Sequence, residues 1–124
     1  MPRILIIEDN EENRDVLARR LERRGYDVVV AADGLQGVEK ARAEKPDAIL
    51  MDMNMPVLDG WQASQMLRAE ADTQDVPIIG LTAHALAGDR EKAIQAGCSD
   101  YHTKPVDFPR LMVQIEDLIR KGQG

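Results

Sequence analysis

The sequence is short of cysteine, aromatic residues and positive charge, and each shortage excludes a class of protein. Its single cysteine, Cys98, cannot form an internal disulfide, so we expect a reducing, cytoplasmic location. Aromatic residues make up 3% of the chain, so the core must be aliphatic. The net charge of -6 argues against a nucleic-acid-binding module. No signal peptide and no apolar run long enough to cross a bilayer is found, so we expect no membrane partner.

The chain does contain enough apolar sequence for one domain. Of its 124 residues, 44% are hydrophobic and 31% are charged, which is typical of a globular protein. No repeat, linker or low-complexity segment divides it. We therefore expect residues 1–124 to form a single domain without an output domain, with a frayed carboxyl-terminal tail at 121–124.

Five short apolar runs alternate with segments of helical length. The runs are residues 3–8, 27–31, 47–52, 76–82 and 99–103. Continuous β-branched runs are typical of strands that are covered on both faces of a parallel sheet. The alternation predicts an open α/β sheet with right-handed crossovers and helices on both faces.

The segments between the runs have helical periodicity. The first helix is expected from about Asn13 to Arg24, with Gly25 as its stop. Its inward-facing residues are expected to be Val16, Leu17 and Leu21. The last helix has the clearest apolar stripe, which consists of Leu111, Met112, Ile115, Leu118 and Ile119.

Charged and polar residues end four of the apolar runs. Ligands of open α/β sheets bind beyond the carboxyl ends of the strands, so these residues are the candidates for a functional site. The set comprises Glu8, Asp9, Asp52, Thr82 and Lys104. Three carboxylates brought together resist joint ionisation unless a cation neutralises them. Oxygen ligands without histidine or cysteine favour a hard divalent ion, and Mg²⁺ is the usual one where carboxylates and a phosphate share it.

These side chains suit phosphoryl chemistry. A carboxylate beside a metal can attack phosphorus and carry the phosphoryl group as an acyl phosphate. We predict Asp52 as the nucleophile because it ends the middle strand. Lys104 is predicted to neutralise the phosphoryl oxygens, and the Thr82 hydroxyl to donate to one of them.

The joint pattern resembles a known family over essentially the whole chain. The matching residues are Glu8-Asp9, Asp52, Met55-Pro56, Asp59-Gly60, Thr82-Ala83 and Lys104-Pro105. With these motifs the chain resembles the receiver domain of bacterial two-component response regulators, of the single-domain, stand-alone type. The resemblance implies a flavodoxin-like (βα)5 doubly wound sheet, with five parallel strands in the order 2-1-3-4-5.

The resemblance also implies a phosphoacceptor signalling switch in a two-component or phosphorelay system. The aspartate that matches Asp52 is phosphorylated by a sensor histidine kinase or a histidine phosphotransfer protein. The residues that match the Mg²⁺ ligands, with Mn²⁺ as a substitute ion, are Glu8, Asp9, Asp52 and the backbone carbonyl of Asn54. Those that match the phosphate-binding positions are Thr82, Ala83 and Lys104.

The conformational switch is implied by the same resemblance. Tyr101 matches the switch aromatic, whose ring turns inward when the hydroxyl of Thr82 moves to the phosphate. Lys104-Pro105 is a candidate for a cis peptide bond. We expect the change to bias a two-state equilibrium and to be sensed by a downstream protein on the face of the fourth helix, fifth strand and fifth helix. The fourth helix, with Leu86 and Ile94 as its only large aliphatic residues, should move at low cost.

Three alternatives stay open. A phosphohydrolase with an aspartyl nucleophile would need a second acid at the position of Asn54. A flavodoxin-like cofactor binder would need a phosphate cradle after the first strand, where the chain has EDNEEN. A receiver fragment of a hybrid histidine kinase would carry the same motifs. We expect the chain to be a signalling domain and not an enzyme, although it would assist its own phosphorylation and dephosphorylation.

Several residues outside this set are also candidates for a functional role. His84, two residues after Thr82, is interpreted as tuning dephosphorylation. His102 stands where related proteins usually have an apolar residue, and we interpret it as a candidate partner contact. Cys98 is interpreted as a small filler, and Trp61 as core packing or a lid beside the site. The arginines of the first helix are interpreted as a solvated face; they are Arg19, Arg20, Arg23 and Arg24.

Overall fold

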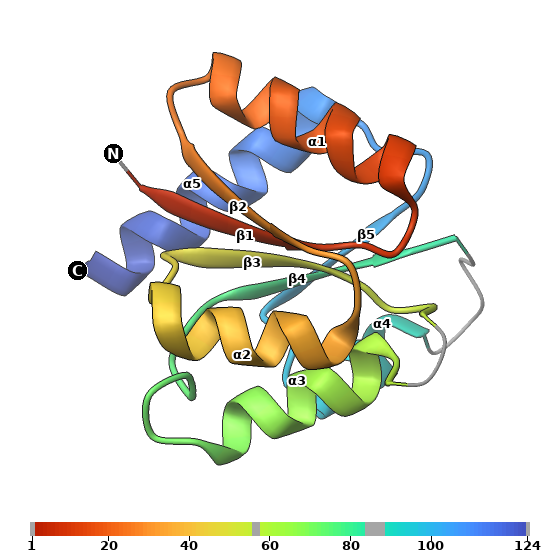
Figure 1. Ribbon diagram of the computed structural model, residues 1–124, viewed down its shortest axis with the longest axis vertical. Helices are drawn as coiled ribbons and strands as arrows, with labels where there is room; N and C mark the ends of the chain where they lie inside the picture. Colours follow the sequence, from red (N-terminus) through yellow and green to blue (C-terminus); the bar gives the residue numbers. More distant parts are fainter. Residues whose placement is uncertain (1, 56–57, 84–88, 124) are drawn as a thin grey trace.

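The computed structural model describes residues 2–55, 58–83 and 89–123, in which strands and helices alternate (Figure 1). The strands are β1 (Arg3–Ile7), β2 (Asp27–Ala31), β3 (Ala48–Asp52), β4 (Ile78–Thr82) and β5 (Asp100–Thr103). The helices are α1 (Glu11–Arg23), α2 (Gly34–Glu44), α3 (Gly60–Ala69), α4 (Asp89–Ala96) and α5 (Phe108–Gln123). The expected strands are confirmed, with ends that differ by two residues at most.

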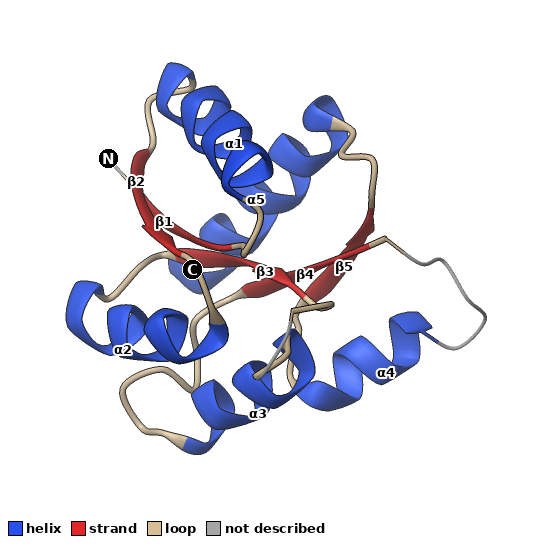
Figure 2. Cartoon of the chain, turned by 45° about the vertical axis from the view of Figure 1, so that its right-hand side comes forward, coloured by secondary structure: helices blue, strands red, loops and turns tan. Residues whose placement is uncertain are grey.

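The strands form one parallel sheet in the order β2-β1-β3-β4-β5, which confirms the predicted flavodoxin-like topology. Helices α1 and α5 cover one face, and α2, α3 and α4 cover the other (Figure 2). Strand β1 shows how both faces are buried: Ile4 and Ile6 point into the core under α1 and α5, while Leu5 and Ile7 point into the core under α2 and α3. All four side chains are fully buried, as the continuous apolar run predicted.

Three helices begin at side-chain caps in the loops that follow β1, β2 and β3. Asn10 accepts a hydrogen bond from the Asn13 N–H at the start of α1, and Asp33 does the same for Gln36 in α2. At α3, Asp59 and Gln62 form a capping box. These caps stabilise the starts of the three helices on the carboxyl side of the sheet.

Helix α1 departs from the expectation in two respects. It begins at Glu11 rather than near Asn13, because the Asn10 cap allows the helix to start earlier. The prediction that Val16 faces inward is wrong, since 48% of this residue is exposed. The same prediction is confirmed for Leu17 and Leu21, which are buried. The helix ends as predicted, with Gly25 at a φ of 92°, in the left-handed region that favours glycine.

The predicted stripe of α5 is confirmed. Four of its residues are buried and Leu118 is partly buried against the same core. Among the described residues, no helix is both long enough and apolar enough to cross a membrane. Pro56, His84 and Leu86 lie outside the described residues, so the expectations that involve them are not tested.

Two interpretations of single residues can be decided. His102 is only 1% exposed, so the interpretation of this side chain as a partner contact is wrong. It is buried between β5 and α5, where its ring nitrogens find polar partners. Cys98 is a buried filler as expected, lying against Met53 and Ser64. Trp61 is partly buried against the core, and the Lys92 ammonium lies 4.9 Å from its ring centroid.

Candidate functional site

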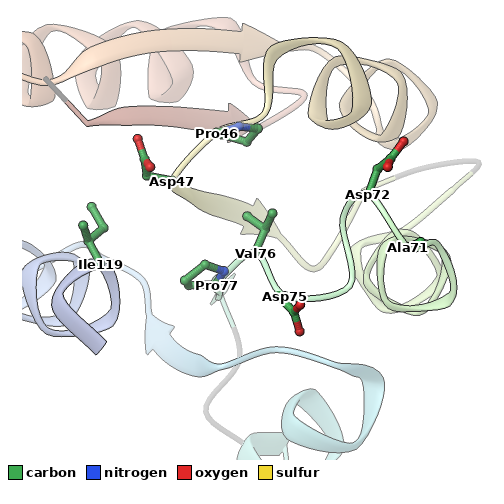
Figure 3. Close-up of a pocket in the computed structure, with 8 residues that line it drawn as sticks. All are labelled: Pro46, Asp47, Ala71, Asp72, Asp75, Val76, Pro77 and Ile119. Carbon is green, nitrogen blue, oxygen red and sulfur yellow. The ribbon is translucent and has the colours of Figure 1, made fainter. Parts of the chain in front are cut away.

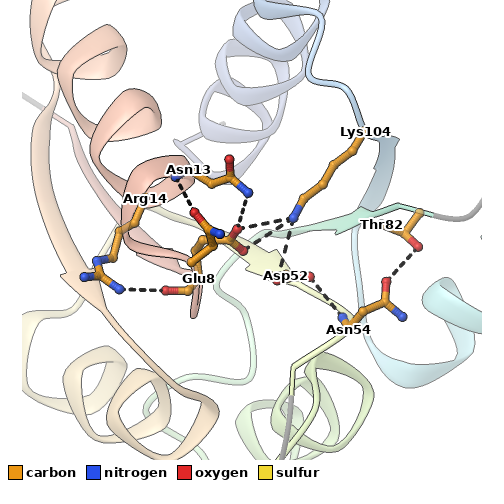
Figure 4. Close-up of polar contacts among 8 residues, drawn as sticks. Glu8, Asn13, Arg14, Asp52, Asn54, Thr82 and Lys104 are labelled. Carbon is orange, nitrogen blue, oxygen red and sulfur yellow. Dashed lines mark hydrogen bonds and ion pairs between the residues drawn. The ribbon is translucent and has the colours of Figure 1, made fainter.

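The polar residues that end the strands converge at one edge of the sheet (Figure 4). Asp52 is the last residue of β3 and is 4% exposed, and Glu8, directly after β1, is 1% exposed. The two strands are neighbours, with Ile7 paired to Met51, so both carboxylates leave the sheet at the same level. Buried carboxylates are costly unless they are paired, and the structure supplies the partners.

Lys104 is the cationic partner of both carboxylates. Its Nζ atom lies 3.3 Å from Glu8 Oε1 and 3.6 Å from Asp52 Oδ2. The lysine reaches this position from the loop after β5, where its N–H donates to the Thr82 carbonyl at 2.6 Å. The Lys104–Pro105 peptide bond is cis. An ammonium between two carboxylates is positioned to neutralise further negative charge that arrives there.

The first turn of α1 holds Glu8 from the other side. The Asn13 Nδ2 atom donates to Glu8 Oε1 at 3.1 Å, and Arg14 Nη1 donates to the Glu8 carbonyl at 3.1 Å. These two residues were missed by the sequence reasoning, which looked only at residues that end strands. Their position in the first turn of the helix that follows the acidic pair is a signal that could have identified them.

The pKa values of the two buried carboxyl groups are shifted in opposite directions. Burial and the neighbouring Asp52 carboxylate raise the pKa of Glu8 from 4.5 to about 7. Burial also opposes ionisation of Asp52, but Glu8, the Asn54 N–H and the Lys104 ammonium together lower its pKa below the usual value. Asp52 is therefore the carboxyl group of the pair that loses its proton first as pH rises, and Glu8 loses its proton only around pH 7 when no cation but Lys104 is near.

Asp9 adds an exposed carboxylate to the same edge. Glu8, Asp9 and Asp52 each offer an oxygen, and these three atoms all lie within 4.8 Å of one another. Such a set of hard oxygen donors, with one side open to solvent, fits a divalent ion such as Mg²⁺. The raised pKa of Glu8 agrees with this fit, because burial and the neighbouring Asp52 carboxylate both oppose its ionisation, and a bound cation would offset both.

Thr82 and Asn54 are joined on the opposite side of Asp52. The Thr82 hydroxyl donates to Asn54 Oδ1 at 3.1 Å, and the Asn54 N–H donates to Asp52 Oδ1 at 3.0 Å. The sequence reasoning considered only the backbone carbonyl of Asn54 and missed the contact of its side chain. Ala83 follows Thr82 and is exposed, and Tyr101 is partly buried against the core under α2 and α3.

Among the hollows formed by the described residues, one adjoins the carboxylate cluster and another lies far from it. A groove of about 340 Å³ adjoins Lys104 between α1 and the start of α5; its lining is Asn13, Val16, Leu17, Lys104, Pro105, Val106 and Phe108. A pocket of about 250 Å³ lies at the opposite edge, where Asp47 precedes β3 and Pro77 precedes β4 (Figure 3). The second pocket is therefore remote from the candidate site.

Comparisons with known proteins agree with this geometry. A family model for the response regulator receiver domain matches residues 4–116. The chain is 34% identical to the polar-differentiation response regulator DivK of Brucella anthropi, over 96% of this chain and 98% of that protein. It is 38% identical to the DNA-binding dual master transcriptional regulator RpaA of Synechocystis, over 98% of this chain but only 50% of RpaA.

Solved structures show the same relationship. The receiver domain of the sensor histidine kinase PA1611 from Pseudomonas aeruginosa, crystallised with a magnesium ion in its active site cleft, is 45% identical and superposes with a TM-score of 0.88, covering 95% of this chain and 97% of that one. The chemotaxis protein CheY4 of Vibrio cholerae is 26% identical, with a TM-score of 0.89, covering 95% and 98%. The chain therefore belongs to the response regulator receiver domains of two-component signalling systems.

Proposed function

We propose that Asp52 is the phosphoacceptor of this receiver domain, and that it takes the phosphoryl group from a phosphohistidine of a sensor histidine kinase or a histidine phosphotransfer protein. The observation that supports this most directly is the nearly buried Asp52 carboxylate at the end of β3 with the Lys104 ammonium 3.6 Å from it, a contact that helps to lower the pKa of Asp52. No other carboxylate at this edge combines a low pKa, a position at a strand end and a cationic partner within the described residues.

The acidic residues would hold a divalent ion beside the nucleophile. We assign Glu8, Asp9, Asp52 and the Asn54 carbonyl as its ligands, with Mg²⁺ as the ion and Mn²⁺ as a substitute that suits the same oxygen donors. When bound, the ion would supply positive charge against the phosphoryl oxygens. The magnesium ion in the similar receiver domain of PA1611 supports this assignment.

The proposed reaction is an in-line transfer to Asp52. A carboxylate oxygen of Asp52 attacks phosphorus while the P–N bond to the donor imidazole breaks, and the imidazole nitrogen retains the bonding electron pair. The product is a mixed anhydride on Asp52 and a histidine side chain on the donor. Lys104 neutralises the transferred oxygens, and we assign Thr82 and Ala83 as the further phosphate-binding residues.

The signal would follow from the movement of Thr82. Its hydroxyl is held by Asn54 in the unphosphorylated chain, and a phosphoryl group on Asp52 offers a stronger, charged acceptor. We propose that Thr82 then moves to the phosphoryl group and that the partly buried Tyr101 ring follows it inward. The equilibrium between the two forms is thereby biased by the new contacts.

We propose that a downstream protein reads this change on the face formed by α4, β5 and α5. Two exposed aliphatic residues support this choice, since Ile94 on α4 is 41% exposed and Val113 on α5 is 56% exposed. The net charge of -6 supports a protein rather than a nucleic acid as the partner. The buried free thiol of Cys98 agrees with a cytoplasmic location.

A turnover phosphohydrolase is the less favoured function. Its chemistry would require a proton-donating acid two residues after Asp52, and that residue is Asn54, whose side-chain oxygen accepts from Thr82. We therefore propose that hydrolysis is limited to the domain's own acyl phosphate.

Phosphoacceptor activity can be tested with a small phosphodonor. We expect acetyl phosphate and Mg²⁺ to label the chain once, at an acid-stable and base-labile site, detected by intact-mass spectrometry. Asp52→Asn should abolish the label, whereas Asp72→Asn, an exposed acid at the opposite edge of the sheet, should not. A label that persists in Asp52→Asn would overturn the assignment. A panel of purified histidine kinases would then identify the natural donor.

A further inference from the structure

His102 lies at the centre of a hydrogen-bond network that joins β5 to the start of α5. Its Nδ1 atom is 2.7 Å from Gln114 Oε1, and the Asp107 N–H donates to its Nε2 atom at 3.1 Å. The Gln114 Nε2 atom donates in turn to Asp100 Oδ2 at 3.0 Å and to the Tyr101 carbonyl at 3.1 Å. A buried imidazole thus has both ring nitrogens engaged.

The donors and acceptors of this network determine the protonation of the ring. A backbone N–H can only donate, so Nε2 of His102 must be an unprotonated acceptor toward Asp107. The single ring proton is then on Nδ1 and is donated to Gln114 Oε1. The Gln114 amide is oriented by its own NH₂ group, which already serves two oxygen acceptors. The network is therefore complete only when the imidazole is neutral.

The same network closes the loop that carries Lys104. At one end of the loop, the Lys104 N–H donates to the Thr82 carbonyl of β4. At the other end, the Asp107 N–H donates to the His102 ring, and the Asp107 carbonyl accepts from the Leu111 N–H in the first turn of α5. The ammonium of Lys104 projects from the first of these two anchors toward the carboxylates of the site.

We propose that neutral His102 is a positioning residue for Lys104, and that a second proton on its ring releases the Lys104 loop and slows phosphoryl acceptance. The proposal rests on the function proposed for Asp52. A proton on Nε2 would point at the Asp107 N–H, so two donors would face each other in a buried position without an acceptor. The hydrogen bond that closes the loop would have to break.

The surroundings of the ring leave no simple way to avoid this conflict. The carboxylate of Asp100 is already bonded to Gln114, and that of Asp107 accepts from the Arg110 N–H. From the sheet, β4 presents Leu81 as the neighbour of His102 in register. Both carboxylates would favour a cationic ring only after the network rearranges, which is the event that frees Lys104.

Two substitutions separate positioning from mere packing. His102→Gln keeps a neutral oxygen that can accept a hydrogen bond from the Asp107 N–H, but its amide side chain does not take up a proton on acidification. His102→Leu has an apolar side chain of similar size and no acceptor. Labelling rates with acetyl phosphate and Mg²⁺ are measured from about pH 5.5 to about pH 8, and each is divided by the wild-type rate at the same pH, which cancels the titration of Glu8. Circular dichroism checks that each variant is folded.

At about pH 8 we expect His102→Gln to keep a rate within about threefold of wild type and His102→Leu to lose about tenfold or more. On acidification, the ratio of His102→Gln to wild type should rise, because only the wild-type chain loses its loop closure. A folded His102→Leu variant with the wild-type rate would overturn the positioning role, and a ratio that stays flat with pH would overturn the effect of the proton.

Amide hydrogen exchange supplies a readout that does not depend on phosphorylation. Without Mg²⁺ or phosphodonor, protection of the Asp107 amide should be lost in His102→Leu, kept in His102→Gln, and lost in wild type on acidification. Unchanged protection in His102→Leu would overturn the proposal. If the wild-type chain takes no label at all, the function proposed for Asp52 fails, while the exchange experiment still decides whether His102 closes the loop.

Discussion

The Thr82 hydroxyl donates a hydrogen bond of 3.1 Å to the side-chain oxygen of Asn54, two residues beyond the proposed phosphoacceptor. Thr82 is 2% exposed, so its hydroxyl needs a protein partner. The backbone N–H of Asn54 donates to Asp52 in the same turn. The residue that contacts the proposed nucleophile therefore also holds the proposed switch hydroxyl, and the proposed switch requires that hydrogen bond to break.

Removal of this acceptor should favour the activated form. In Asn54→Ala the backbone N–H and carbonyl remain, but the acceptor that Asn54 offers to the Thr82 hydroxyl is removed, so we expect tighter binding of beryllofluoride, a phosphoryl mimic, by about two- to fivefold. Thr82→Val removes the donor and serves as the matched control, in which binding should weaken. Calorimetric titration with Mg²⁺ present measures both. Weaker binding to Asn54→Ala would contradict the prediction.

The pKa of Glu8 predicts how stability depends on pH in the absence of divalent ions. Its pKa is about 7 in the folded chain, against 4.5 as the usual value, so the folded state binds more protons between these values. The free energy of unfolding should therefore fall as pH rises through this window, on the order of 1–3 kcal/mol. The contribution of Asp52 to the free energy of unfolding does not change within this pH window, because its pKa lies below the usual 3.8 and its carboxylate is ionised throughout the window.

Glu8→Gln tests this prediction, since the amide does not titrate. The free energy of unfolding of both proteins is measured by urea denaturation with a chelator present. As pH rises, the wild type should lose stability relative to the variant. Mg²⁺ at about 100 times its Kd should restore about 2.7 kcal/mol to the wild type at high pH, and chelation should reverse this. A difference that is constant with pH would show that Glu8 is already ionised in the folded chain.

Substitution of Lys104 should separate metal binding from phosphoryl transfer. In Lys104→Met, Glu8 and Asp52 lose their shared cation, so we expect Mg²⁺ to bind a few-fold more tightly, since the ammonium no longer repels it. The rate of labelling by acetyl phosphate should fall by about 10- to 100-fold, because the charge that neutralises the phosphoryl oxygens is gone. Lys121→Met, on an exposed position of α5, is the control and should match wild type in both assays. Labelling of Lys104→Met at the wild-type rate would exclude the assigned role.

Gly60 is required where α3 begins, close beneath the site. A Cβ atom at this position would lie 2.6 Å from the Asp52 carbonyl oxygen and 2.6 Å from Met53 Cα, and both are backbone atoms that cannot move aside separately. We expect Gly60→Ala to lower the free energy of unfolding by about 2–4 kcal/mol and to slow labelling of Asp52 as well. Gln65→Ala, on the exposed face of the same helix, should change stability by about 0.5 kcal/mol or less in denaturation experiments. An equally small effect of Gly60→Ala would contradict the close packing.

The sequence pattern was informative wherever local chemistry and sheet geometry act together. Parallel strands bring their carboxyl ends to one edge, so acids that end β1 and β3 had to meet, and Glu8 and Asp52 do. The stripe of α5 was likewise readable from its spacing. For α1 the spacing identified Leu17 and Leu21 correctly but not Val16, because Val16 is also apolar and only packing on the sheet decides which apolar residues at the edge of the stripe are buried.

The partners of the site residues lay beyond sequence reasoning for a related reason. Asn13 and Asn54 are polar residues in a helix turn and a loop, where such residues usually face water. Only the close approach of α1 to Glu8, and of the loop after β3 to Thr82, turns them into specific hydrogen-bond partners. His102 was misread for the converse reason, since a polar side chain on a strand suggests exposure, while Gln114 and Asp107 meet its ring inside the protein.

The sequence by itself determined the family, the order of strands and helices and the residue types at the strand ends, because apolar periodicity and the spacing of a few polar residues specify these directly. The tertiary structure decided which of those residues share charge, protons and hydrogen bonds. Electrostatic interactions between buried groups depend on distances of a few ångströms across elements that are far apart in the chain, and Lys104 and Glu8 are separated by 96 residues. That distance-dependent coupling holds the pKa of Asp52 below that of its neighbour Glu8.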